Sequence, residues 1–427
     1  CLRRIFLFFV LVRLVRAFSG WYNQAKELNG MDFFATAAFG LEGLVKRELH
    51  GLRLNAACET GGVRFQASPA QAFAANLWLR TADRVLLIAG EGHVESFEDL
   101  FQLTLSIPWE DFLPKDAKFP VSGKCARSQL MSVRDCQAIV KKAVVERLKR
   151  HYKTAWFQEN GAEYPIDVSI HENRARIALD TSGAALNRRG YRTWNGEAPL
   201  RETLAAALVM LSPWKAEEPL YDPCCGTGTL LIEAAYLRAQ RAPGLTRSFA
   251  CEQWPLFPKA ALDEIRREAE TRFEPARIGA ICGSDIDPQA LELCKRHVKQ
   301  AGLGGRITVS QRDLRSLCLE GRAPFFLLNP PYGERLADRR SCEGLYRELR
   351  MLWDRHPGSG MGVITAHTGF ERCFGRRAEQ KRRLYNGRLE CEFYLYPSTG
   401  SSRSQRTGPS SPEGESCMKE EKRSSMA

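Results

Sequence analysis

The chain has 427 residues, of which 44% are hydrophobic and 26% are charged. These proportions are typical of a soluble globular protein, so we expect neither a disordered chain nor a membrane protein. The length leaves room for two or three domains. The formal net charge is +12, and residues 118–153 hold ten basic residues against two acidic ones. Such a cluster suits a phosphate-rich partner, although a solvated helix face is the alternative.

The 14 cysteines are scattered along the chain and form no C-x-x-C pair. In a chain of this size the pattern predicts reduced, mostly buried thiols, no metal site and a cytoplasmic protein. Residues 1–30 combine an apolar run with interrupting arginines, and we expect them to be a non-native or upstream extension before a natural start at Met31. Residues 398–427 are rich in Ser, Gly, Pro and charge, which predicts a disordered tail.

Residues 31–83 read as strand, helix, strand, helix, with strands at 33–38 and 62–66 and helices at 41–49 and 69–80. This order predicts a small α+β module of the ferredoxin-like kind. A second module is expected over residues 84–192, with strands at 85–89, 119–122, 166–171 and 174–180 and a helix at 136–151.

Cations gather at two places in the second module. Ile139, Val140, Val144 and Leu148 have helical spacing, so they bury one face of the helix and leave cations on the other. The second cluster, NRRGYR, ends the module and also contains Tyr191, which we expect to be exposed. The candidate phosphate-binding residues are Lys124, Arg127, Lys141, Lys142, Arg188, Arg189 and Arg192.

From residue 198 to 397 the pattern changes to alternating strands and helices. A helix at 200–211 and a strand at 220–221 lead to DPCCGTGT and a helix at 230–241. A strand that runs through glycines into a helix lets a ligand approach the backbone and presents free N–H groups at the helix start. Gly226 and Gly228 alone are a weak signal, since a dinucleotide motif would have a third glycine.

Three further strands also end in polar residues. Residues 278–285 end at Asp285, residues 307–313 end at Asp313, and the apolar run 325–328 is followed by Asn329; an inserted loop and helix is expected at 242–276. In a doubly wound parallel sheet these carboxyl ends share one edge, and ligands bind there. The sequence therefore predicts an α/β, Rossmann-like domain with one composite site.

DPCCGTGT, GSDIDP, QRD and NPPYGERL, in this order, resemble the motifs of class I S-adenosylmethionine-dependent methyltransferases that act on exocyclic amines of nucleobases. FGRRAEQKRRLYNGRLECEFYLY and LDTSGAALNRRGYR are similar to the bacterial THUMP-domain methyltransferases of large-subunit ribosomal RNA, which methylate guanine N2. The resemblance extends from Met31 to Pro397, without the second, fused methyltransferase of some members. It implies a THUMP RNA-binding domain at 84–192 and a methyltransferase domain at 198–397.

The resemblance also implies roles for individual residues. Asp222, Gly226 and Gly228 would hold the methionine moiety of S-adenosylmethionine, Asp285 its ribose, and Asp313 would lie by the adenine amino group. Two alternatives remain at the second strand end: Asp287 is a rival ribose ligand, and Asp285 could simply cap the next helix.

The NPPY segment suggests how an amine is methylated. An exocyclic amine is a poor nucleophile because its lone pair is conjugated into the ring. Two acceptors, the side-chain oxygen of Asn329 and the carbonyl of Pro330, would localise that lone pair, and Tyr332 would support the extruded base. A proline turn with a buried aromatic ring is the structural alternative.

The predicted function is S-adenosylmethionine-dependent methylation of the exocyclic N2 amine of a guanine in large-subunit (23S) ribosomal RNA. NPPY does not distinguish guanine from adenine, so an adenine-N6 DNA or RNA methyltransferase is the alternative enzyme. A ribosome-assembly factor that binds RNA without catalysis is the alternative outside enzymes.

Overall fold

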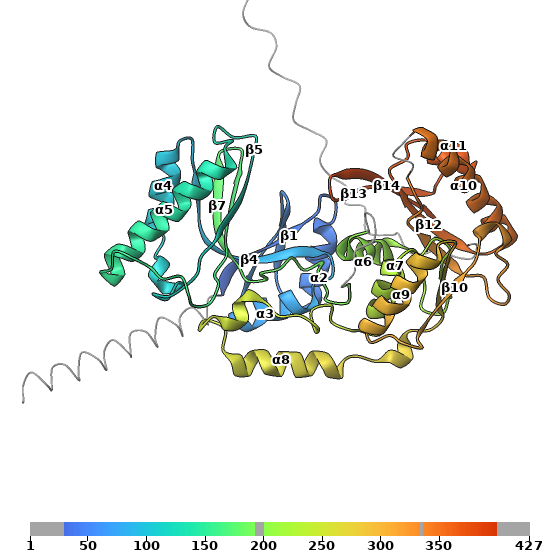
Figure 1. Ribbon diagram of the computed structural model, residues 1–427, viewed down its shortest axis with the longest axis horizontal. Helices are drawn as coiled ribbons and strands as arrows, with labels where there is room; N and C mark the ends of the chain where they lie inside the picture. The colour runs from blue at the N-terminus through green and yellow to red at the C-terminus, as the bar shows by residue number, and fades with distance from the viewer. Residues whose placement is uncertain (1–29, 193–199, 333–335, 399–427) are drawn as a thin grey trace, which may run out of the picture.

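The computed structural model describes residues 30–192, 200–332 and 336–398, which build two seven-stranded sheets (Figure 1). The expected extension at residues 1–30 and the expected disordered tail therefore fall almost entirely outside the described residues. No helix among the described residues is long and apolar enough to cross a membrane.

The first sheet begins with a ferredoxin-like unit. Its elements are β1 (Met31–Ala37), α2 (Glu42–Gly51), β2 (Ala56–Glu59), β3 (Gly62–Ala67), α3 (Pro69–Trp78) and β4 (Ala82–His93). The strands lie in the order β2-β3-β1-β4, and each pairs antiparallel with its neighbour. This is the βαββαβ arrangement. The four-residue strand β2 is the element that the sequence pattern did not predict.

The second module continues the same sheet. It contains α4 (Phe97–Ser106), β5 (Val121–Ala126), α5 (Val133–Tyr152), β6 (Ile166–His171) and β7 (Arg174–Asp180). Strand β4 is 12 residues long, and its second half pairs antiparallel with β7. The boundary expected between residues 83 and 84 thus falls inside one strand, and the two modules share one sheet.

The second sheet has the predicted doubly wound, mostly parallel form. Its elements are α6 (Glu202–Leu211), β8 (Leu220–Asp222), α7 (Thr229–Arg238), α8 (Lys259–Thr271), β9 (Ile281–Asp285), α9 (Pro288–Gln300), β10 (Ile307–Gln311), β11 (Phe325–Leu328), α10 (Leu336–Arg355), β12 (Gly360–Thr365), α11 (Phe370–Phe374), β13 (Gln380–Asn386) and β14 (Leu389–Tyr396). The order is β10-β9-β8-β11-β12-β14-β13, parallel from β10 to β12 and antiparallel at β14 and β13.

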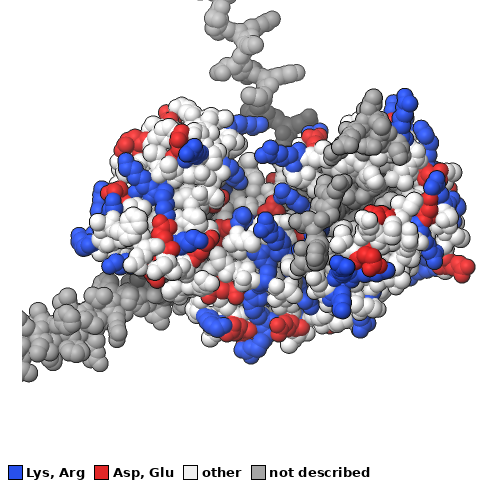
Figure 2. Space-filling view, viewed as in Figure 1, with Lys and Arg blue, Asp and Glu red and all other residues white. Residues whose placement is uncertain are grey.

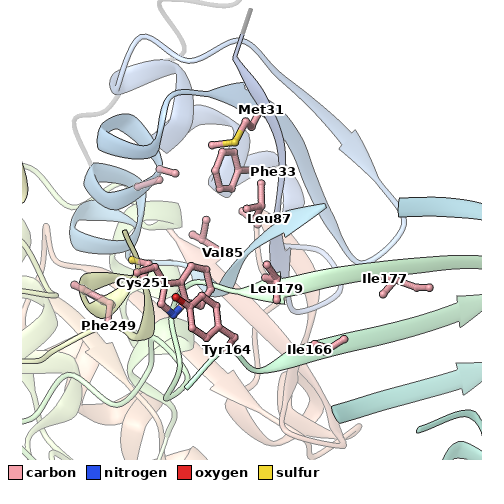
Figure 3. Close-up of a cluster of buried hydrophobic side chains, with 14 of the residues drawn as sticks. Met31, Phe33, Val85, Leu87, Tyr164, Ile166, Ile177, Leu179, Phe249 and Cys251 are labelled. Carbon is pink, nitrogen blue, oxygen red and sulfur yellow. The ribbon is translucent and has the colours of Figure 1, made fainter. Parts of the chain in front are cut away.

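The segment between α7 and β9 joins the two halves. Phe249, Cys251 and Trp254 belong to the same buried cluster as Val85 and Tyr164 of the first sheet (Figure 3). The Trp254 ring stacks on Tyr164 with centroids 4.8 Å apart, and its Nε1 donates to the Glu163 carbonyl at 2.9 Å. The insertion expected from the sequence at 242–276 is thus a strap, whose helix α8 lies beside α3 of the ferredoxin-like unit (Figure 1).

Candidate active site

Four strand ends converge at one edge of the second sheet, as the sequence predicted. Strands β10, β9, β8 and β11 are parallel neighbours, so their carboxyl ends lie side by side. The chain moves outward from β8 through β9 to β10 and then returns to β11, on the other side of β8. The point where this order reverses, between β8 and β11, is where ligands bind in such sheets.

The loop after β8 is shaped by its glycines. Gly228 has φ of +83°, and a Cβ at this position would collide with Cys294 Sγ. Gly226 faces open space, and its N–H donates to Asp285 Oδ2 at 2.8 Å. Helix α7 starts at Thr229 without a side-chain cap, because its N-cap is Gly228. The first-turn N–H groups therefore remain available to a ligand.

The carboxyl groups at the strand ends lie close together. Asp222 is buried, and its Oδ1 accepts a hydrogen bond from the Cys224 N–H at 3.0 Å. Burial raises the pKa of Asp222, and the nearby carboxylate of Asp285 raises it further. The pKa of the Cys224 thiol is also raised, first by burial and then by Asp222, Asp285 and Asp313. All three acids therefore lie near enough to Cys224 to act electrostatically on its thiol.

Asp285 and Asp287 have different roles in the structure. Asp287 is the N-cap of α9, and its carboxylate accepts from the Gln289 N–H at 2.8 Å. Asp285 is half-buried at the end of β9; one oxygen accepts from Gly226 and the other from the Asp287 N–H at 3.0 Å. An ionised carboxylate has about four acceptor positions, so Asp285 can still bind two hydroxyls.

Ile286, between these two acids, is a residue that the sequence reasoning missed. Its side chain is 63% exposed at the sheet edge. An apolar side chain beside a cluster of carboxylates offers a surface for a planar, uncharged ring. The sequence did contain a signal for this residue, because an isoleucine between two acids at the end of a strand is not expected to be buried in the core.

Asp313 is held locally. Its carboxylate caps the short turn that follows and accepts from the Arg315 N–H and Nε at 2.9–3.0 Å. The hydrogen bonds from Arg315 lower the pKa of Asp313. Asp313 thus lies at the same sheet edge as Asp222 and Asp285. Some of the lone pairs of its carboxylate already accept hydrogen bonds from Arg315.

The NPPY segment begins directly after β11. The Tyr332 hydroxyl donates to Asn329 Oδ1, and both side chains are half-buried. The buried Tyr346 hydroxyl donates to the Pro331 carbonyl at 2.9 Å and lies 3.0 Å from Thr365 Oγ1. These bonds fix the turn from both sides. Glu334 and Arg335, which follow in the sequence, lie outside the described residues.

Four of the seven candidate phosphate-binding residues are exposed. Lys124, Arg127, Lys142 and Arg188 have exposed side chains, and Arg127 makes only a 3.8 Å ion pair with Glu172. Figure 2 shows Lys and Arg side chains gathered along the middle of one face, between the two halves, and over the lobe that carries α4 and α5. These four positions are geometrically open to an anionic partner.

The other three cations are engaged within the protein. Lys141 Nζ lies 2.7 Å from both Glu159 oxygens and 3.6 Å from the centre of the Phe119 ring. Arg189 is buried, donates to the carbonyls of Leu186 and Arg80, and lies 3.5 Å from Glu233. Their placement does not support the phosphate contacts expected from the sequence.

Arg192 and Tyr191 also differ from expectation. The side chain of Arg192 is 11% exposed; it pairs with Glu202 at 3.4 Å and donates to Thr229 Oγ1. Tyr191, expected at the surface, is buried with its hydroxyl 3.0 Å from Glu233 Oε1. Arg189, Tyr191 and Arg192 of the NRRGYR segment therefore point into the junction between the two halves, whereas Arg188 stays exposed.

A doubly wound sheet with this edge is the arrangement of a class I methyltransferase. The chain matches the RMKL-like methyltransferase domain over residues 189–394, the RlmL ferredoxin-like domain over 32–86 and the THUMP domain over 94–180. It is 39% identical over 364 residues to a provisionally named RNA methyltransferase, YpsC of Bacillus subtilis, covering 85% of this chain and 94% of that protein. The chain belongs to the THUMP-domain, class I S-adenosylmethionine-dependent methyltransferase family.

Solved structures agree over nearly the same span. A predicted N6-adenine-specific DNA methylase from Listeria monocytogenes is 41% identical with a TM-score of 0.83, covering 88% of this chain and 98% of that one. SMU.472, solved in complex with SAH, is 36% identical with a TM-score of 0.82, covering 87% and 98%. The methyl donor of the present protein is S-adenosylmethionine.

Proposed function

We propose that this protein methylates the exocyclic N2 amine of a guanine in large-subunit (23S) ribosomal RNA. The observation that carries the proposal is the position of Asn329 and Pro330 at the end of β11, the strand hydrogen-bonded to β8. Since β8 leads into the glycine loop, an amine held at Asn329 lies beside the methyl donor's binding loop.

The residues at this edge fit S-adenosylmethionine. The open space at Gly226 and the uncapped start of α7 admit the methionine moiety beside Asp222. In this proposal Asp285 accepts the two ribose hydroxyls, Asp313 accepts the adenine amino group, and the exposed Ile286 packs against the ring. When bound, the cofactor supplies an electrophilic methyl group on a sulfonium.

The protein's own contribution is to orient the amine. Asn329 Oδ1 has two lone pairs; Tyr332 uses one, so the second can accept an N–H of the substrate. The Pro330 carbonyl is the proposed second acceptor. Two acceptors on the amine hydrogens direct its lone pair at the methyl group, and the methylated amine then loses a proton without needing a strong base.

Tyr332 is proposed to support the target base after it leaves its stack. The bond from its hydroxyl to Asn329 fixes the plane of the phenol ring. An aromatic face contributes roughly 1–3 kcal/mol to holding a base. The same side chain would therefore place the base and steady the acceptor that recognises its amine.

RNA as the substrate is supported by the N-terminal half. The match to a THUMP domain, the name of the Bacillus subtilis relative and the four exposed cations Lys124, Arg127, Lys142 and Arg188 all favour it. Ribosomal RNA and the guanine N2 atom are the finer parts of the proposal, and they rest on the sequence resemblance.

Adenine N6 is the second candidate. The similar protein from Listeria monocytogenes is named as a predicted N6-adenine-specific DNA methylase. The amine-binding arrangement at Asn329 is compatible with either base, because both present an exocyclic amine.

The decisive experiment offers the protein labelled S-adenosylmethionine with unmodified ribosomal RNA and with DNA. Label on guanine N2 of the large-subunit RNA supports the proposal, whereas label on DNA alone overturns it. Mapping methylated nucleotides in ribosomal RNA from cells with and without the gene identifies the position.

Asn329→Ala separates an enzyme from an assembly factor. Loss of one preorganised oxyanion-hole donor lowers kcat by about 10²–10³-fold, and we expect a loss of similar size for this acceptor, with RNA affinity unchanged. Asn329→Asp, which keeps an acceptor oxygen, should retain more activity. If cells with Asn329→Ala were indistinguishable from wild type in the protein's biological effect, catalysis would not be its role.

A further inference from the structure

The hairpin β13–β14 passes the catalytic edge of the sheet. Strand β14 pairs antiparallel with β12, and Glu392 lies opposite Thr365, the last residue of β12. Residues 386–391 therefore extend beyond the carboxyl end of β12, on the side where the NPPY segment lies. The tip contains Asn386, Gly387 and Arg388.

The hairpin touches the catalytic segment. Tyr332 is close enough to Cys391 and Asn386 for both to affect its pKa, which is raised mainly by burial. Tyr332 also packs against the buried cluster that contains Leu384 and Cys391. One side of the hairpin tip is thus a wall of the candidate active site.

A loop of the ferredoxin-like unit meets the hairpin. Gly40 has φ of +86°, and a Cβ there would lie 3.1 Å from the Arg383 carbonyl. Its neighbour Phe39 contacts the Tyr385 ring edge-to-face, with centroids 5.8 Å apart. Figure 1 shows the β13–β14 hairpin beside the start of α2. Phe39 of the N-terminal half therefore contacts the hairpin at Tyr385, and the next residue, Asn386, lies near Tyr332.

Phe39 is unusual in being uncovered at this junction. Its side chain is 66% exposed, although the adjoining Leu41 and Leu44 are buried in the methyltransferase core. Phenylalanine gains little from such a position unless a partner covers its ring. The Tyr385 contact is edge-to-face and does not cover the ring as a stacked partner would.

Two arginines lie at the tip of the hairpin whose Tyr385 contacts the exposed Phe39 ring. Arg388 at the hairpin tip is exposed, and Arg201 Nη2 lies 3.9 Å from the Cβ position of Gly387 in the same turn. Arg388 forms no ion pair with another of the described residues, whereas Arg201 lies near enough to Asp83 to oppose the rise that burial causes in the pKa of that carboxyl. An aromatic face interleaved with arginines is the combination that binds single-stranded nucleic acid, through base stacking and phosphate contacts.

We propose that Phe39, Arg201 and Arg388 form a second nucleotide-binding site, which holds a nucleotide flanking the methylated base of an RNA substrate. The flanking base stacks on Phe39, and the phosphate between the two nucleotides binds the arginines. This site rests on the proposed function, since it assumes an RNA strand that enters the pocket at Asn329. It explains why the ferredoxin-like unit is docked at the hairpin tip.

The test compares Phe39→Ala, Phe39→Leu and Phe39→Trp in the full chain. Phe39→Ala and Phe39→Leu should lower kcat/KM for ribosomal RNA by about 5- to 150-fold, the range for loss of one stacked base, whereas Phe39→Trp should stay near wild type. Melting temperature and affinity for S-adenosylhomocysteine should not change. Phe97→Ala, at another exposed phenylalanine (39% exposed), is the matched control.

The outcomes separate this site from the proposed function. Full activity of Phe39→Leu would assign Phe39 to packing and overturn the site, while the methyltransferase proposal stands. If wild-type protein labelled no RNA, the proposed function would fail on its own. The same variants are then compared by fluorescence anisotropy with a short single-stranded RNA, where equal affinities of Phe39→Ala and Phe97→Ala overturn the site.

Discussion

At the scale of single residues, Asn329 depends on its neighbours for its geometry. Its side-chain oxygen accepts from Tyr332, and the turn that follows is fixed by Tyr346 through Pro331. Orientation of a single acceptor matters, because small displacements of catalytic groups cause large losses of rate. The aromatic residues of this segment therefore have a positioning role in addition to any contact with the base.

Tyr332→Phe tests that positioning role. The substitution keeps the ring but removes the hydroxyl that donates to Asn329, a loss of one hydrogen bond worth about 1 kcal/mol. We expect the single-turnover rate of methyl transfer to fall by roughly 5- to 10-fold, with unchanged RNA affinity. Tyr332→Ala should lose both ring and hydroxyl and be slower still. Equal rates for wild type and Tyr332→Phe would show that Asn329 is held by other contacts.

At the scale of elements, helix α7 is hydrogen-bonded to Tyr191 and Arg192, which lie in the segment that links the two halves. Arg192 donates to Thr229 at the first turn of α7, and Tyr191 donates to Glu233 one turn later. The start of α7 carries the N–H groups proposed to face the cofactor. The linking segment thus positions the loop that we propose to bind the cofactor, whereas its sequence alone suggests an RNA contact.

Arg192→Met should therefore weaken cofactor binding more than RNA binding. We expect roughly a tenfold loss of affinity for S-adenosylhomocysteine by isothermal titration calorimetry, the equivalent of about 1.4 kcal/mol, because Thr229 and Glu202 both lose their contact with Arg192. Arg267→Met, at an exposed position on α8, is the control. Loss of RNA affinity with intact cofactor affinity would instead assign Arg192 to an RNA contact.

The sequence predicted elements well where local pattern decides them. Strands β6 and β7 have the predicted bounds, because alternating apolar residues define them. Helix α4 was missed although Ser96 and Asp99 form a capping box, a signal that was available. The edge of the second sheet was predicted because four strands end in polar residues in sequence order.

What the sequence did not predict depends on partners distant in the chain. Arg189 and Tyr191 are buried because they meet Glu233, 44 and 42 positions later. Phe39 meets Tyr385 in another domain. No periodicity within the NRRGYR segment distinguishes an arginine that binds phosphate from one that fills a domain junction, so these assignments required the fold.

At the scale of the whole molecule, the two halves form one body. The strap between α7 and β9 places Phe249 and Trp254 in the core of the first sheet, and Leu41 and Leu44 of the ferredoxin-like unit enter the core of the second. Each half therefore contributes apolar side chains to the other. An RNA gripped by the N-terminal half is consequently held at a fixed position relative to Asn329.

The adjacent residues Lys141 and Lys142 test where that RNA lies. Lys142 is exposed on α5, whereas Lys141 is paired with Glu159 and covers Phe119. Lys142→Glu combined with Arg127→Glu should weaken RNA binding and flatten the slope of log Kd against log salt by about 1–2, because each lost phosphate contact releases about one counterion fewer.

Lys141→Met should instead lower the melting temperature and leave the salt slope unchanged. If Lys141→Met flattened the slope and the Lys142→Glu, Arg127→Glu variant did not, the RNA would lie against the face of α5 that holds Glu159, and the exposed cations would be a solvated surface.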